Sequence, residues 1–254
     1  MAISLRDILA FFVEFERALI LEAPPGVFEE EPRSSTRLLE RFSAYFGGPI
    51  RVVIVESYEG LDLAGDVIIR NDELGSLVLV YYKDKRPVGA DILLNNAKLT
   101  DDKPVFNYCY RRFLAIKEAF HVVLRFELIK EGRNYDYPDS NQAKSMMPSI
   151  ERLIFLPFAI IDFDDPEYTD DVKIENAAEL LAVLMLYPIE KIASDRNTFT
   201  AAVGAEFDDP TAIATSTKAF AELHKIPQRY VDLIFRWQGF DSFYSRIRQL
   251  RAGH

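Results

Sequence analysis

The chain has a single cysteine, only three histidines and no long uncharged apolar run. Its one thiol, Cys109, cannot form a disulfide within the chain, and such sparse use of cysteine is typical of a reducing compartment. No segment approaches the ~20 consecutive apolar residues that a transmembrane helix needs. Charged residues also interrupt the first apolar stretch, so no signal peptide is expected. We therefore expect a cytoplasmic protein without a membrane partner.

The sequence also lacks an excess of basic residues and a glycine-rich phosphate-binding loop. It has 30 Lys and Arg against 40 Asp and Glu, which gives a formal net charge of −10. An acidic surface repels phosphate backbones unless it carries a local basic patch. The densest basic stretch, 236–251, is short and fits a solvated helix face equally well. Nucleic acid is therefore not expected as a partner.

Hydrophobic periodicity predicts both helices and strands. Helical spacing of apolar residues predicts helices over 4–21, 35–46, 104–128 and 174–187. Four short β-branched runs, separated by turn residues, predict a sheet of three or four strands. These runs are 52–55, 67–69, 77–82 and 91–94.

The segments between and after these elements are less regular. The polar composition of 131–148 predicts a loop. Residues 150–161 are apolar enough for either a helix or a strand. An acidic loop is predicted over 162–171, and two or three further helices over the C-terminal part. The helices from 211 to 238 also permit a helix-turn-helix, although the acidic charge favours a bundle that contacts protein.

The predicted fold class is α+β. A small, mostly antiparallel sheet packs on a buried motif helix, and a helical C-terminal part follows. We divide the chain into N-terminal helices (1–48), an α+β core (49–190) and a C-terminal helical region (191–254), all within one compact unit. The helix over 104–128 is apolar around much of its circumference, which is typical of a buried helix.

The central helix carries a pattern that suggests metal chemistry. A zinc peptidase helix needs His-Glu-x-x-His, because two imidazoles one turn apart can reach one zinc while the Glu activates a bound water. In this chain, Arg112, Phe113, Glu118 and His121 stand in register with such a motif. The first ligand position, however, holds Lys117.

These residues resemble the signature of the ImmA/IrrE-type zinc metallopeptidases, in which Arg-Phe and a short apolar stretch precede His-Glu-x-x-His. A second stretch, 175–188, resembles the family's downstream helix, with matches at Ala178, Ala182, Leu186 and Pro188. The resemblance covers about 36–240, including later helices near 221–231. It implies a zincin-like scaffold, and an insertion around 130–170 would explain the long spacing between the two motifs.

The resemblance also implies a set of site residues. Its third metal ligand maps to Glu175, with Glu179 as the nearby alternative. Lysine only donates hydrogen bonds and is cationic, so Lys117 cannot replace an imidazole as an ordinary zinc ligand. We therefore expect no cofactor and treat Lys117, His121 and Glu175 as vestigial metal positions. Glu118 is a vestigial general base, because a carboxylate without a metal-bound water is a poor hydrolase.

Each site residue also has a purely structural interpretation. A lone histidine on an apolar face, such as His121, is usually a packed and hydrogen-bonded side chain. Glu118 would then be a buried carboxylate paired with Lys117 or Arg112. The Glu118 to His121 spacing also matches the ExxH of di-iron bundles, but the chain has no second ExxH.

We expect Arg112, Lys117 and Glu179 to form ion pairs in the cleft. Two carboxylates in a partly desolvated site repel each other, so a cation must stand where zinc stood or the carboxylates must separate. The Lys117 ammonium can reach this place on its four-carbon stem. The sequence therefore predicts that its nitrogen lies within about 4 Å of the carboxylate of Glu175 or Glu179.

The sequence thus predicts a degenerate metallopeptidase that acts as a regulatory protein by binding a partner or ligand in the former cleft. The resemblance implies roles in stress response or in phage and mobile-element regulation, where a transcriptional repressor is one candidate partner. Two alternatives stay open. One is an active metal-dependent peptidase with a non-standard ligand set, which would require zinc, and the other is a phage or plasmid structural or interaction protein.

Overall fold

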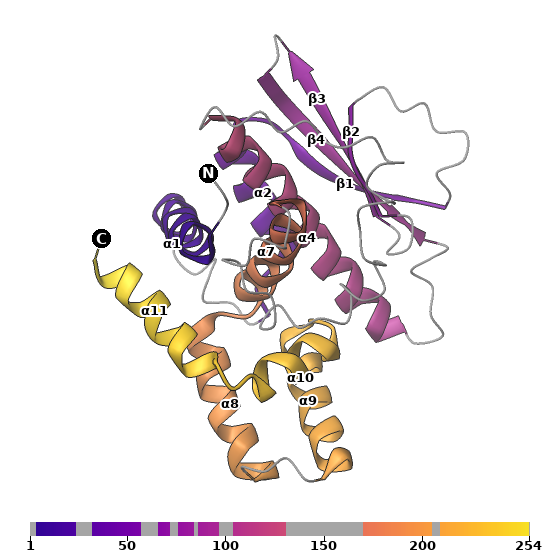
Figure 1. Ribbon diagram of the computed structural model, residues 1–254. Coiled ribbons are helices and arrows are strands. Elements are labelled where there is room, and N and C mark those ends of the chain that lie inside the picture. Colours follow the sequence, from indigo (N-terminus) through magenta and orange to yellow (C-terminus); the bar gives the residue numbers. More distant parts are fainter. Residues whose placement is uncertain are drawn as a thin grey trace.

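The fold is α+β, with a small sheet and a helical C-terminal part, as predicted (Figure 1). The computed structural model describes residues 4–23, 32–56, 66–71, 76–83, 86–96, 104–130, 170–204 and 209–253. The first half of the described chain contains α1 (Leu5–Glu22), α2 (Ser35–Phe46), β1 (Ile50–Val55), β2 (Asp66–Asn71), β3 (Ser76–Lys83) and β4 (Arg86–Asn95). The second half contains α4 (Pro104–Lys130), α7 (Asp170–Leu186), α8 (Ile189–Val203), α9 (Pro210–His224), α10 (Gln228–Arg236) and α11 (Phe240–Ala252).

The four strands form one mixed sheet in the order β1-β4-β3-β2. The β2–β3 and β3–β4 pairs are antiparallel, so the sheet is mostly antiparallel as expected. The β1–β4 pair is parallel, with Ile50 opposite Ala90. Composition does not distinguish the two pairing directions, because β-branched residues suit both.

The bounds of α2 agree with the prediction because both ends of this helix are fixed locally. The side chain of Ser34 accepts a hydrogen bond from the Arg37 backbone N–H, which caps the N-terminus. Gly47 ends the helix in the left-handed region at φ 79°. A Cβ on the next residue, Gly48, would lie 2.1 Å from the carbonyl oxygen of Val88, so the turn into β1 needs glycine there.

The C-terminal part contains four described helices rather than the two or three that were predicted. The break between α10 and α11 falls at 237–239, where Gly239 stands but no proline. Helix α7 also begins at Asp170, so 170–171 are helical and do not belong to the predicted acidic loop. Acidic residues suit the positive end of a helix dipole. The predictions for 131–148, 150–161 and 162–169 lie outside the described residues.

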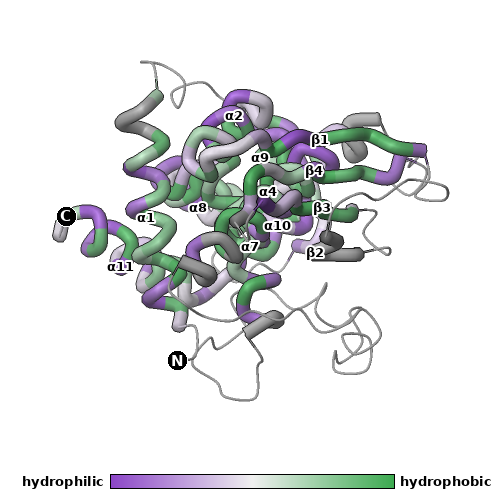
Figure 2. Tube along the Cα trace, turned by 90° about the horizontal axis from the view of Figure 1, so that it is seen from above, coloured by the Kyte–Doolittle hydropathy of each residue, from purple (hydrophilic) through white to green (hydrophobic). Residues whose placement is uncertain are grey.

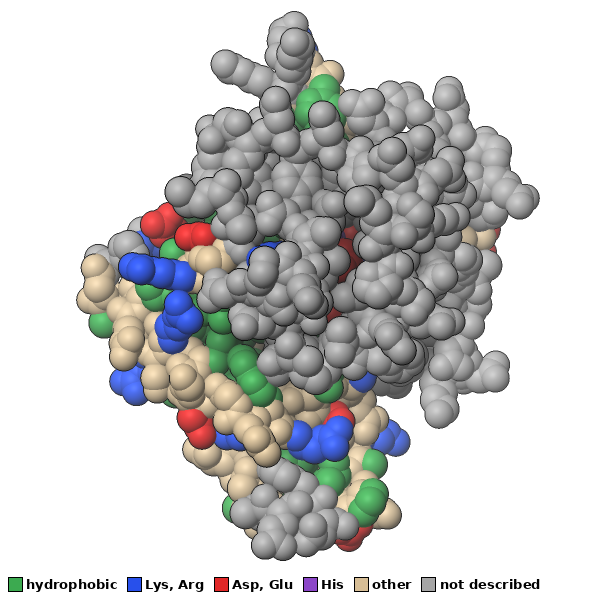
Figure 3. All heavy atoms as spheres, in the orientation of Figure 1, with side chains coloured by type: hydrophobic (Ala, Val, Ile, Leu, Met, Phe, Trp, Pro, Cys, Tyr) green, Lys and Arg blue, Asp and Glu red, His purple; other side chains and the backbone are tan. Residues whose placement is uncertain are grey.

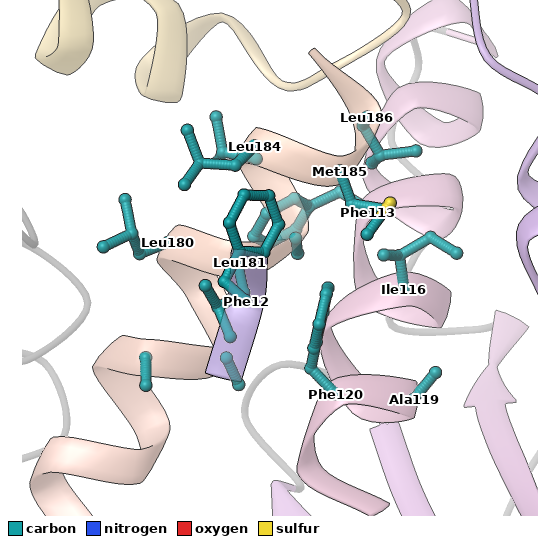
Figure 4. Packing of buried hydrophobic residues seen from close by; sticks show 14 of the residues in the cluster. Phe12, Phe113, Ile116, Ala119, Phe120, Leu180, Leu181, Leu184, Met185 and Leu186 are labelled. Carbon is teal, nitrogen blue, oxygen red and sulfur yellow. The ribbon is translucent and has the colours of Figure 1, made fainter. Parts of the chain in front are cut away.

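Helix α4 lies at the centre of the molecule, with the sheet on one side and α7 on the other (Figure 1). Figure 4 shows apolar side chains of α4 and α7 meeting, with Phe12 of α1 beside them. The predicted buried character of the motif helix is therefore confirmed over 112–124, whereas Tyr108 near its start is exposed. One buried apolar cluster includes residues from all three predicted segments of the chain.

Hydropathy alternates along the described helices, as amphipathic helices require (Figure 2). On the face shown in Figure 3, basic and acidic side chains are interspersed over the described part. None of the described helices is both long and apolar enough to cross a membrane.

Candidate functional site

The two motif helices meet at a cluster of charged side chains. Lys117 and His121 lie one turn apart on α4, and both reach Glu175 on α7. The Lys117 ammonium contacts Glu175 Oε1, while His121 Nε2 lies 3.0 Å from Glu175 Oε2. The predicted contact between Lys117 and a carboxylate of the second helix is therefore confirmed, with Glu175 as the partner.

The cluster is almost completely enclosed. The side chains of Lys117 and Glu118 are fully buried, whereas Glu175 keeps 22% of its surface exposed. Isolated buried charges are unfavourable, so these groups need one another. Glu175 is the member that a ligand from outside can reach most directly.

Opposing influences act on the charge states of Lys117 and Glu175. Burial is the largest influence on Lys117 and lowers its pKa, but the charges of Glu175, Glu118 and Glu179 together raise that pKa above its ordinary value. For Glu175, burial raises the pKa, but Lys117 and His121 together bring it well below the usual range. Lys117 is therefore an ammonium and Glu175 a carboxylate at neutral pH.

Glu118 is anchored to the sheet. Ser76, the first residue of β3, donates a hydrogen bond of 2.8 Å from its Oγ to Glu118 Oε1. The Lys117 nitrogen lies 3.7 Å from the same oxygen. Glu118 thus faces both the ammonium and a fixed hydroxyl donor.

The hydrogen bonding of this cluster is incomplete among the described residues. Glu118 Oε2 and His121 Nδ1 are buried and have no hydrogen-bond partner there. The Lys117 nitrogen and His121 Nε2 both lie against the Glu175 carboxylate, which is their charged partner in the cluster. The cluster is therefore a polar centre in which buried atoms retain unmet hydrogen-bonding capacity.

Glu179, one turn after Glu175 on α7, has a different partner. The hydroxyl of Tyr230 on α10 donates a hydrogen bond of 3.0 Å to Glu179 Oε1. Burial raises the pKa of Glu179, although the charge of Lys117 acts in the opposite direction. The predicted ion pair of Glu179 is therefore replaced, among the described contacts, by a hydrogen bond to Tyr230.

Arg112 does not form the predicted ion pair among the described residues. Its Nη1 donates to the carbonyl oxygens of His224 and Lys225, each at 2.8 Å, and its Nη2 donates to the carbonyl of Arg33. Burial lowers the pKa of Arg112 to about 10. Carbonyls at the end of α9 lack partners within their helix and lie at its negative pole, so a guanidinium suits them well. Arg112 fastens the end of α9 to α4.

The sequence interpretation missed Ser76, Arg229 and Tyr230. Ser76 lies 42 residues from Glu118, and Tyr230 lies 51 residues from Glu179. No spacing rule along one helix or strand links such distant positions. Only the packing of β3 and α10 against the two motif helices brings them to the site.

The donor set does not fit the zinc that the resemblance implies. Lys117 stands at the first ligand position and is held in its ammonium form, which has no lone pair for a metal. No group of three or more His, Cys, Asp or Glu placed to hold a metal occurs in the described part of the chain. The raised pKa of Lys117 also disfavours the neutral amine that covalent catalysis by lysine requires.

Comparisons of the chain with protein-family models, curated proteins and solved structures found no match. The likeness to the ImmA/IrrE family therefore rests on the residues of the two motif helices.

Proposed function

We propose that this protein is a degenerate metallopeptidase of the ImmA/IrrE type that works by binding a partner rather than by cleaving it. The observation that carries the proposal is the Lys117 ammonium against Glu175, with His121 at the same carboxylate. The three side chains stand at the positions that the family motif gives to its metal ligands. A fixed cation from the chain thus takes the role of the zinc charge.

The consequences for chemistry follow from this replacement. An ammonium keeps the carboxylate of α7 beside α4, but it cannot lower the pKa of a water molecule as a metal does. Glu118 is fully buried and engaged by Ser76 and Lys117, which does not suit a general base. The scaffold is therefore retained without the hydrolytic reaction.

Binding is the activity that this arrangement supports best. Glu175 is partly exposed while its neighbours are buried with unmet hydrogen bonds, and such groups are more typical of a binding site than of a packed core. We propose a protein partner in the cytoplasm, with a transcriptional repressor or another regulator as the class that the resemblance implies.

Nucleic acid is a less suitable partner than protein. The α9–α10 pair has the connectivity of a helix-turn-helix, in which the start of the second helix reads bases. Here Tyr230, at the start of α10, is buried and donates to Glu179. Arg229 likewise packs over the rings of Tyr110 and Tyr230 instead of facing outward.

Zinc titration of Lys117→His tests the proposal. This variant would place two imidazoles one turn apart on α4, opposite Glu175, and should bind zinc at least tenfold more tightly than the original protein. Lys117→Met is the matched control, because it removes the ammonium without adding a ligand. The gain should disappear in Lys117→His with His121→Ala.

Peptidase activity should be measured on the same proteins. We expect none from the original protein with or without added zinc. Zinc-dependent cleavage of a peptide library by the original protein would instead favour the active-peptidase alternative. Failure of folded Lys117→His to gain zinc affinity would contradict the zincin-like ancestry.

A further inference from the structure

Two glutamates on α7 are nearly equivalent in sequence, but only one contacts the ammonium. Glu175 and Glu179 are four residues apart, so they lie on the same side of the helix. The charge of Lys117 acts on both carboxylates. Of these two glutamates, Glu175 alone lies within ion-pair distance of the ammonium, while Glu179 has another partner.

The side chain that engages Glu179 is Tyr230. Its hydroxyl accepts a hydrogen bond of 2.6 Å from Arg229 Nη2 and donates one of 3.0 Å to Glu179. Its ring packs against Phe113, one turn before Lys117, with 4.3 Å between ring centroids. Because Arg229 can only donate, the phenol hydrogen is left to point at the carboxylate.

We propose that Tyr230 determines which glutamate serves the cation of the site. By holding Glu179, it leaves Glu175 as the carboxylate of α7 that pairs with Lys117, beside Glu118 of α4. This inference rests on the proposed role of the Lys117 ammonium as the cation of the site. Without the phenol hydroxyl, Glu179 is a buried carboxylate that has lost its donor, and its strongest remaining attraction is Lys117. It then turns toward the ammonium and competes with Glu175.

A double-mutant cycle between Glu175 and Tyr230 tests this assignment. The unfolding equilibrium is measured for Glu175→Gln, for Tyr230→Phe and for the two changes together. Glu175→Gln alone removes the α7 carboxylate from the ammonium, which keeps only Glu118 of its two ion-pair partners among the described residues. In the double variant Glu179 is free to replace Glu175. The factor by which the folding equilibrium constant falls should therefore be about tenfold smaller than the product of the factors for the two single variants.

Tyr110→Phe is the matched control, because the Tyr110 hydroxyl shares the same Arg229 donor. Its combination with Glu175→Gln should show no such rescue. Losses that multiply in the Tyr230 cycle, or an equal rescue by Tyr110→Phe, would overturn the assignment.

If Glu175→Gln does not fold, a crystal structure of the single variant Tyr230→Phe tests the same assignment. We expect a Glu179 oxygen within about 4 Å of the Lys117 nitrogen. An unmoved Glu179 would overturn the inference. If the cycle shows rescue while Lys117→His gains no zinc affinity, the selection by Tyr230 stands and the metallopeptidase ancestry fails.

Discussion

Two buried contacts between a histidine and a carboxylate in this molecule have almost the same length but different surroundings. His121 Nε2 lies 3.0 Å from Glu175, and His224 Nε2 lies 2.9 Å from Asp195. Asp195 also accepts a 2.8 Å hydrogen bond from the hydroxyl of Tyr187, whose ring stacks on His224 with 3.9 Å between centroids. The fully buried side-chain polar atoms of Tyr187, Asp195 and His224 all have hydrogen-bond partners.

The difference separates a structural polar centre from a candidate site. The group around Asp195 joins the end of α7 to α8 and α9, and none of its fully buried side-chain polar atoms lacks a partner, as expected of a polar network that stabilises a core. The group around Glu175 contains more charge and leaves several polar atoms without hydrogen bonds. In this molecule the unmet hydrogen bonds therefore distinguish the group around Glu175 as the candidate site.

The largest expected effect comes from removing the cation of the site. Lys117→Ala leaves the carboxylates of Glu118 and Glu175 buried without their ammonium, and we expect a loss of about 3–5 kcal/mol in the free energy of unfolding. Urea denaturation measures this loss. Adding Glu175→Ala should recover a large part of it, because the orphaned carboxylate is then absent. Additive losses would show that Lys117 and Glu175 are not coupled.

Asp195→Ala is the corresponding change at the structural centre. It leaves the Tyr187 hydroxyl and the His224 ring nitrogen without their acceptor, and we expect a loss of about 2–3 kcal/mol by urea denaturation. In a protein that also carries Lys117→His, this change should leave the zinc affinity unaltered. If Asp195→Ala lowered the zinc affinity of Lys117→His, the two centres would not be independent, which would contradict this interpretation.

Arg112→Lys should have a smaller effect. Lysine keeps the charge but cannot reach three carbonyls with one planar group, so we expect a loss of about 1–2 kcal/mol. Hydrogen exchange should show that protection falls mainly at the end of α9, where Arg112 binds the carbonyls of His224 and Lys225. Loss of protection centred on α7 instead would contradict the assigned role of Arg112.

The acid dependence of stability should show the smallest effect. The pKa of Glu175 is depressed in the folded protein, so its contribution is present above the ordinary value of 4.5 and is lost as the pH falls toward the folded value. The pKa of Lys117 is raised, so its contribution is fully present throughout that acid range. Unfolding free energies measured below pH 4.5 should fall less steeply in Glu175→Gln than in the original protein. Equal slopes would contradict the pairing.

Local signals explain why much of the fold was predictable. The Ser34 cap and Gly47 mark α2 in the sequence itself, and helical spacing brings Lys117 and His121 to one face of α4. The parallel β1–β4 pair was not predictable, because strand composition does not encode the direction of pairing. The break between α10 and α11 has only Gly239 as a local signal, without a proline.

Tertiary contacts decided what the sequence left open at the site. Spacing could not choose between Glu175 and Glu179, because the hydrogen bond from Tyr230 comes from a distant helix. Arg112 was assigned to an ion pair because it accompanies the motif, whereas its observed partners are backbone carbonyls at the end of α9. Such partners depend on how α9 and α4 pack, which no local pattern reports.

Elemental analysis of the purified original protein tests the central claim most directly. If the Lys117 ammonium has replaced the metal, zinc should remain far below one atom per chain even after equilibration with zinc and removal of the excess. One zinc per chain that is lost in His121→Ala would contradict the account, because the metal would then share its site with the ammonium.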